Sequence, residues 1–192
     1  THRLLDSLGD LVPPYSRVYQ DAWGDVVRRG TGVRERVEQA FDGLADLEPW
    51  DVARLGVAAH RVDTLSQYRP HLQRTVDREV ETGALINAMS MLHMIMMDQI
   101  AVGEWEEAER TGQRCLELAT THRHTLFVLH ARAQLGLLAA LRGQVDRARE
   151  LQALVEAWAR PRGIGMLTQL SDAIGTAAAL AEGDYEAAYL HA

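Results

Sequence analysis

Polar and apolar positions repeat at a fixed distance in the second half of this chain. The segments GEWEEAE, GQVDRAR and GDYEAAY begin at Gly103, Gly143 and Gly183, at equal intervals of about 40 residues. Each segment places Gly first, an aromatic residue or Val third and Ala sixth, with an acidic residue among them. A fixed period of roughly 20–50 residues is typical of proteins built from stacked repeats. The pattern therefore predicts a helical-repeat architecture.

The chemistry of these segments predicts two helices joined by a tight turn in each repeat. Gly ends the first helix because it adopts the left-handed conformation of a helix C-cap at little cost. The acidic residues after it favour the start of the second helix, where the helix dipole is positive. The period continues upstream, since Leu55–Gly56 lies two periods before Leu135–Gly136, with Ile95–Met96 midway.

These signals predict the helix boundaries. First helices are expected at about 49–62, 88–102, 127–142 and 166–182, and second helices at about 65–81, 105–120, 145–159 and from 185 onward. Residues 15–29 and 33–46 form one more predicted pair around a break at Gly30–Gly32. The helix pairs thus cover about 15–46, 49–81, 88–120, 127–159 and 166–192.

No alternating strand pattern competes with the helices, so we expect an all-α fold. The expected architecture is a right-handed α-α superhelix of antiparallel helix pairs, with a period of about 40 residues. We interpret residues 1–192 as a single helical-repeat domain taken from a longer chain.

The stretch AQLGLLAALRGQVDRARELQ, residues 133–152, resembles a tetratricopeptide repeat. Leu135 and Gly136 stand at the small-residue contact, Gly143 at the turn and Ala148 in the second helix. The period exceeds the usual length of about 34 residues and is similar to that of the superhelical region of MalT-type regulators. The resemblance implies a solenoid of helix pairs.

A wider resemblance covers residues 45–192. The segments LEPWDVARLGVAAHRVDTL, GALINAM and GEWEEAERTGQRCLELA resemble the corresponding region of large ATP-binding LuxR-family regulators from actinomycetes. That family carries an NTPase module upstream and a DNA-binding helix-turn-helix at its C-terminus. Neither motif occurs here, so the resemblance implies only the sensor or interaction segment.

Composition excludes several classes of function. The net charge is −7 and all 20 basic residues are Arg, without a basic run, so no surface for nucleic acid is expected. The absence of Lys excludes a P-loop and a Schiff-base enzyme. No apolar run approaches the ~20 residues that span a bilayer, and no signal peptide opens the sequence. A single cysteine, Cys115, suits a reducing cytoplasm.

The register of the first helices predicts a groove, because these helices line the concave face of a tetratricopeptide-like superhelix. The projected positions are almost uncharged, which favours an occupant. They are Trp50, Ala53, Val57 and His60; Ser90, His93, Met97 and Ile100; His130, Ala133, Leu137 and Ala140; and Leu170, Ala173, Ala177 and Leu180. As the candidate groove for a ligand or partner we take Trp50, Val57, His60, His93, Met97, Ile100, His130 and Leu137.

Histidine and methionine raise the question of metal. His60, His93 and His130 project to the groove from three consecutive repeats, which suggests a pH-sensitive anchor or a metal site. Five of the six methionines fall in INAMSMLHMIMMDQI, residues 86–100. Helical geometry splits these side chains between faces, so an adaptable core is favoured over a copper site. We expect no metal and no cofactor.

No catalytic motif is found, so a non-enzymatic function is expected. We predict the sensor or protein-interaction segment of a LuxR/MalT-type transcriptional regulator. A small apolar effector, a peptide or a protein partner in the groove would control oligomerisation or DNA binding by other domains. A passive interaction scaffold and a peptide-sensing quorum regulator are the alternatives. Self-association is expected, and contact with a membrane is not.

Overall fold

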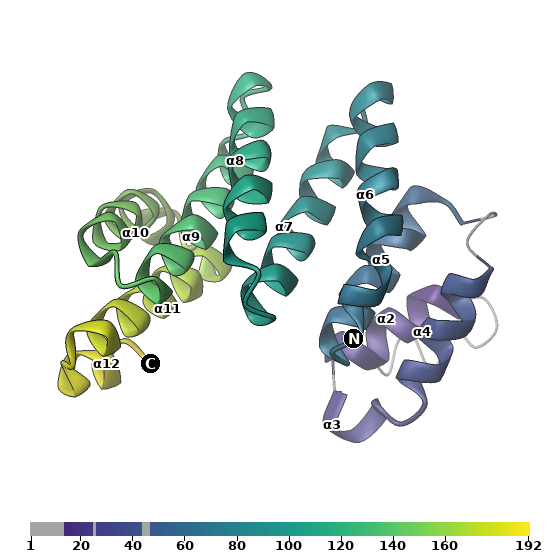
Figure 1. Cartoon of the computed structure of the whole chain (residues 1–192), viewed down its shortest axis with the longest axis horizontal. Helices are drawn as coiled ribbons and strands as arrows, with labels where there is room; N and C mark the ends of the chain where they lie inside the picture. The colour runs from purple at the N-terminus through teal and green to yellow at the C-terminus, as the bar shows by residue number, and fades with distance from the viewer. Residues whose placement is uncertain (1–13, 25, 44–46) are drawn as a thin grey trace. The chain divides into compact units, whose positions relative to one another are not determined.

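The computed structural model describes residues 14–24, 26–43 and 47–192, and every regular element within them is a helix (Figure 1). This confirms the predicted all-α class, which follows from a chain rich in Ala, Leu, Arg and Glu. The chain divides into two compact units, Thr1–Asp98 and Gln99–Ala192. The interpretation of residues 1–192 as one domain stays a prediction.

Unit 1 is built around α5. Its helices are α2 (Pro14–Gly24), α3 (Val26–Arg29), α4 (Val33–Asp42), α5 (Pro49–Arg61), α6 (Leu65–Thr82) and most of α7 (Leu85–Ala101). Helix α5 packs against α2, α4 and α6. A Cβ on Gly56 would lie 2.9 Å from Leu72 Cδ2 and 3.4 Å from Met94 Cε. Gly56 therefore lets α5 approach both α6 and α7.

Unit 2 is a set of helices packed on their neighbours in sequence. It contains α8 (Trp105–Thr121), α9 (Thr125–Leu141), α10 (Val145–Ala159), the short helix η3 (Arg160–Arg162), α11 (Gly165–Glu182) and α12 (Tyr185–His191). Helix α9 packs against α8, α10 and α11. A Cβ on Gly136 would lie 2.9 Å from Ile174 Cδ1 and 3.2 Å from Leu151 Cβ. Gly136 thus has the same role in α9 that Gly56 has in α5.

One turn geometry recurs along both units. From residue 63 onward, the described residues with positive φ are evenly spaced, with 20 residues from each to the next: Asp63, Gly83, Gly103, Arg123, Gly143, Gly163 and Gly183. After each one, the next backbone N–H donates to the carbonyl five residues earlier, at 2.8–3.1 Å. This is the 6→1 hydrogen bond of the Schellman motif. All seven acceptor residues are buried, and five of them are Ala.

From residue 49 onward, the observed helices agree with the predicted boundaries to within about three residues, and the largest difference there is at α7, which begins at Leu85 instead of 88. Helix α4 ends at Asp42, before the predicted end at 46. Within the helix predicted at 15–29, the structure describes α2 and α3, and residue 25 between them lies outside the described residues. Of the helix predicted at 33–46, residues 44–46 lie outside the described residues.

The methionine-rich segment forms α7. Met89, Met91, Met94 and Met96 are buried in it, and Met97 is the exposed one. Helix α7 is apolar on nearly all sides, so it has little amphipathic character. The methionines of this helix therefore serve chiefly as core.

The turns make a testable prediction. Gly143 has φ +72° and nothing within 4 Å of a Cβ placed on it. Gly143→Ala should therefore lower the free energy of unfolding by about 1 kcal/mol through backbone strain alone. Gly165→Ala is the matched control, because that Cβ also meets nothing and Gly165 lies in the first turn of α11. Urea unfolding of both variants measures the difference, and equal stabilities would contradict the account.

Candidate functional site

The solvent-facing row of the first helices in unit 2 is uncharged. We define the unit 2 first-helix face as eight side chains: Leu126, His130, Leu137 and Leu141 of α9, and Met166, Leu170, Ala177 and Leu180 of α11. Each is exposed or partly buried. Helices α9 and α11 pack on each other, and the two sets occupy similar positions one repeat period apart. The face is therefore an apolar surface shared by two adjacent helices.

The projected groove positions of unit 2 fall at or just below this face. His130 and Leu137 are partly buried and belong to it. Ala133 and Ala140 are fully buried beneath it. Sequence reasoning missed Leu126, Leu141 and Met166, although Leu126 lies four residues before His130 and Leu141 four residues after Leu137.

Unit 1 carries a similar row on α5 and α7. We define the unit 1 first-helix face as Trp50, Val57, His60, Ile86 and Met97, all exposed or partly buried. His93 was projected onto the same row but is only 3% exposed, so its ring lies in the core. Ile100, in the last turn of α7, is partly buried. Of the three candidate groove residues in α7, Met97 and Ile100 thus reach solvent and His93 does not.

The two histidines of these faces are shifted toward the neutral form. Burial lowers the pKa of His130 to about 4. Burial also lowers the pKa of His60, with a contribution from Arg61, while Asp98 and Asp63 act in the opposite direction. At neutral pH the two histidines therefore add no charge to the faces, although the guanidinium of Arg54 lies over the ring of Trp50 at 5.5 Å. A pKa of about 4 argues against His130 as an anchor that titrates near neutrality.

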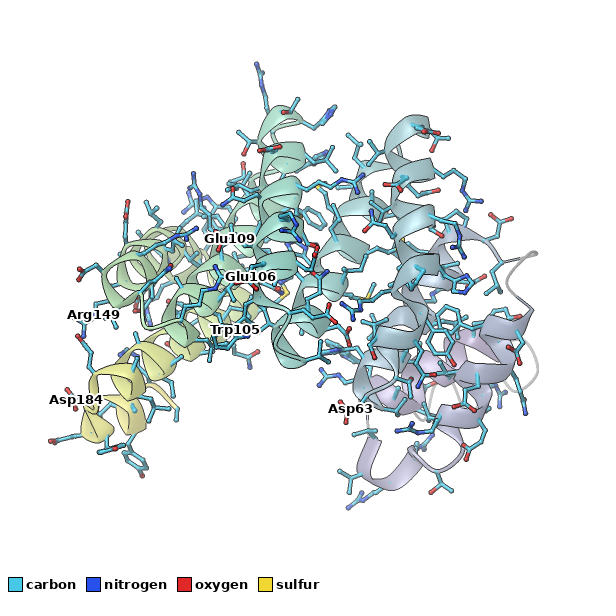
Figure 2. The ribbon with its side chains drawn as sticks, in the orientation of Figure 1. Asp63, Trp105, Glu106, Glu109, Arg149 and Asp184 are labelled. Atoms are coloured by element: carbon cyan, nitrogen blue, oxygen red, sulfur yellow. The ribbon has the colours of Figure 1, made fainter. Side chains whose placement is uncertain are left out.

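Charged residues of the second helices form ion pairs with residues in, or at the end of, the first helix that follows. Positions 69, 109 and 149 are equivalent, because one repeat period separates each from the next. Arg69 pairs with Asp98 at 3.0 Å, Glu109 with Arg142 at 2.6 Å, and Arg149 with Glu182. Figure 2 shows Glu109 on α8 and Arg149 on α10. An ion pair therefore recurs at this position, although the residue there is Arg at 69 and 149 and Glu at 109.

Glu109 pairs with two arginines, Arg142 and Arg147. Burial opposes ionisation of its carboxylate, but the hydrogen bond from Arg147 and the charges of Arg147 and Arg142 outweigh burial. The pKa of Glu109 therefore lies below its ordinary value. Arg147 Nη2 lies 2.7 Å from Glu109 Oε1. This cluster links α8, the end of α9 and the start of α10.

The described residues offer neither a metal site nor an activated thiol. Among the described residues, no group of three or more His, Cys, Asp or Glu side chains is arranged to hold a metal ion. Cys115 is buried, and burial raises the pKa of its thiol to about 12. A thiol with this pKa is a poor nucleophile at neutral pH.

A separate hollow of about 360 Å³ lies against α2 and α4. Its lining is Tyr15, Arg17, Val18, Arg36, Gln39 and Ala40. Arg36 pairs with Asp21 at 3.0 Å and donates to the carbonyl of Gly32. Nothing in the sequence pattern signalled this hollow, and its charged lining differs from the apolar faces.

No family model, curated protein or solved structure matches the chain. The resemblance to MalT-type regulators therefore rests on the quoted residues. Among the described residues, none of the helices combines the length and the apolar character that crossing a membrane requires.

The pKa of His130 predicts a pH dependence of stability. Below pH 6.5, the ordinary value, the unfolded chain binds a proton that the folded chain excludes until about pH 4. The free energy of unfolding should therefore decrease as the pH is lowered across that window, by at most about 1.4 kcal/mol per pH unit. His130→Leu, the residue found at position 170, should remove this part of the dependence. Urea unfolding between pH 7 and 4 gives the difference, and parallel curves for the two proteins would contradict the prediction.

Proposed function

We propose that the chain is a non-enzymatic interaction module that binds an apolar partner on a first-helix face. The observation that carries the proposal is the contrast between the two sets of helices. Eight side chains of α9 and α11 form a face without charge, while the second helices pair their charges through Glu109 and Arg149. A surface without charged side chains favours an apolar binding partner.

The architecture we propose is a tetratricopeptide-like solenoid with a period of about 40 residues. The even spacing of the turns at half this period supports it, because two turns complete one helix pair. The close approaches at Gly56 and Gly136, which lie two periods apart, support it as well. In such a solenoid, equivalent positions of successive first helices form a continuous surface.

The specific form of the proposal follows the sequence resemblance of residues 45–192. We propose the sensor or interaction segment of a LuxR/MalT-type transcriptional regulator in the cytoplasm. A ligand on the first-helix faces would favour one arrangement of the helix pairs and so control oligomerisation or DNA binding elsewhere. A scaffold without an effector and a peptide-sensing quorum regulator are the alternatives that the binding test separates.

A matched pair of variants tests binding at the face. Leu180 of α11 lies on the unit 2 first-helix face and is 52% exposed, while Leu154 of α10 lies outside it and is 45% exposed. A thermal-shift screen against small apolar compounds and amphipathic helical peptides supplies a ligand. Leu180→Glu should weaken binding of that ligand at least about tenfold by placing a charge against it. Leu154→Glu should leave the affinity unchanged.

The screen also distinguishes the forms of the proposal. A compound that stabilises the chain supports the effector-sensing form, and a peptide supports the peptide-binding form. Stabilisation by no member of either panel contradicts ligand sensing and favours the scaffold. Equal loss of affinity in both variants would contradict the placement of the site on α9 and α11.

Self-association forms a further part of the proposal. Tyr185, Tyr189 and Leu190 of α12 are all highly exposed. An apolar helix surface of this kind favours contact with another protein surface. We expect light scattering to show a concentration-dependent increase in mass, which Tyr189→Glu should reduce. A monomer at high concentration would contradict this part.

A further inference from the structure

The six methionines fall into two groups of different exposure. Met89, Met91, Met94 and Met96 are 0–8% exposed in α7. Met97 and Met166 are 37% and 46% exposed. The four buried thioethers are covered by the core, whereas a small oxidant in solution reaches the other two.

Both exposed methionines lie on first-helix faces. Met166 begins the row of α11 at the position that Leu126 holds in α9, one repeat period earlier. Met97 holds in α7 the position that Leu137 holds in α9. Equivalent positions of the repeat therefore carry either a leucine, which peroxide does not attack, or a methionine, which it does.

Oxidation at these positions changes the surface chemically. The thioether sulfur attacks one oxygen of hydrogen peroxide, an S–O bond forms, the O–O bond breaks, and water leaves after proton transfer. Sulfur loses two electrons and the peroxide gains them, so the step needs no other reactant. The product is a polar sulfoxide that reductases convert back to the thioether. A hydrogen-bond acceptor then stands on a face that is otherwise apolar.

We propose that Met97 and Met166 are modification sites, oxidised by hydroperoxides to sulfoxides that weaken apolar binding at the first-helix faces. The position of both residues on the faces carries the proposal, together with the burial of the other four methionines. The effect on binding rests on the proposed function, whereas the selectivity of oxidation does not.

Peptide mass spectrometry of the whole chain, after mild treatment with hydrogen peroxide, tests the selectivity. Sulfoxide should form at Met97 and Met166 about tenfold faster than at the four buried methionines, which react only when the core opens. In urea all six rates should converge. Equal rates in the folded chain, or faster oxidation of a buried methionine, would overturn the assignment.

Binding is tested with variants that the repeat itself supplies. The fluorescent probe 1-anilinonaphthalene-8-sulfonate reports the exposed apolar faces. Peroxide should lower its affinity for the unmodified chain by about threefold or more, because sulfoxides are polar. The double variant Met97→Leu, Met166→Leu, which takes the residues of positions 137 and 126, should keep its affinity after the same treatment.

Three outcomes separate the two proposals. Circular dichroism of the oxidised chain must show retained helix, and loss of helix would overturn control by the two surface sites. Equal loss of probe affinity in the double variant would overturn the role of Met97 and Met166. If the untreated chain does not bind the probe, the proposed apolar binding at the faces is contradicted. The selectivity of oxidation is then judged by mass spectrometry alone.

Discussion

The structure depends on one local constraint, the left-handed residue that ends a helix and the hydrogen bond that follows it. From Asp63 to Gly183 this constraint recurs at every half period, and each time the next N–H reaches the carbonyl five residues earlier. The turn leaves only one further residue before the next helix, so its length is fixed. Together with the even spacing of the turns, this fixed length puts Gly56 and Gly136 in the same register relative to the turn that follows each of them. The packing of Gly56 and of Gly136 follows from that register.

The same register separates two kinds of surface chemistry. Residues at 69, 109 and 149 on the second helices reach the following first helix as ion pairs. Exposed ion pairs contribute little to stability. A cluster such as Glu109 with Arg142 and Arg147 instead favours one pairing of neighbouring helices over others, because a mismatched pairing would leave its charges without partners. The first-helix faces carry apolar side chains and histidines instead, although the same helices also hold partly exposed charges such as Arg54 and Asp172. The proposed function and the proposed oxidation sites both follow from this separation.

The sequence predicted the turns at Gly103, Gly143 and Gly183 and the helix boundaries on either side of them, because the C-cap requirement is local. It did not predict the left-handed conformations of Asp63 and Arg123, since nothing in either side chain signals positive φ. Leu126 was missed because α9 was expected to begin at 127, and the helix begins at Thr125. The burial of His93 was missed because α7 is apolar nearly all round, so its register alone does not say which side the neighbours cover.

The claim that the faces of α9 and α11 bind an apolar partner is tested most directly by methyl NMR. Leucine and methionine methyl signals of the whole chain would be followed during titration with the strongest ligand from the screen. The account predicts that the largest shifts occur at Leu126, Leu137, Met166 and Leu180, and that Leu154 of α10 stays unchanged. Shifts centred on Leu154, with the methyl signals of the face unchanged, would contradict it.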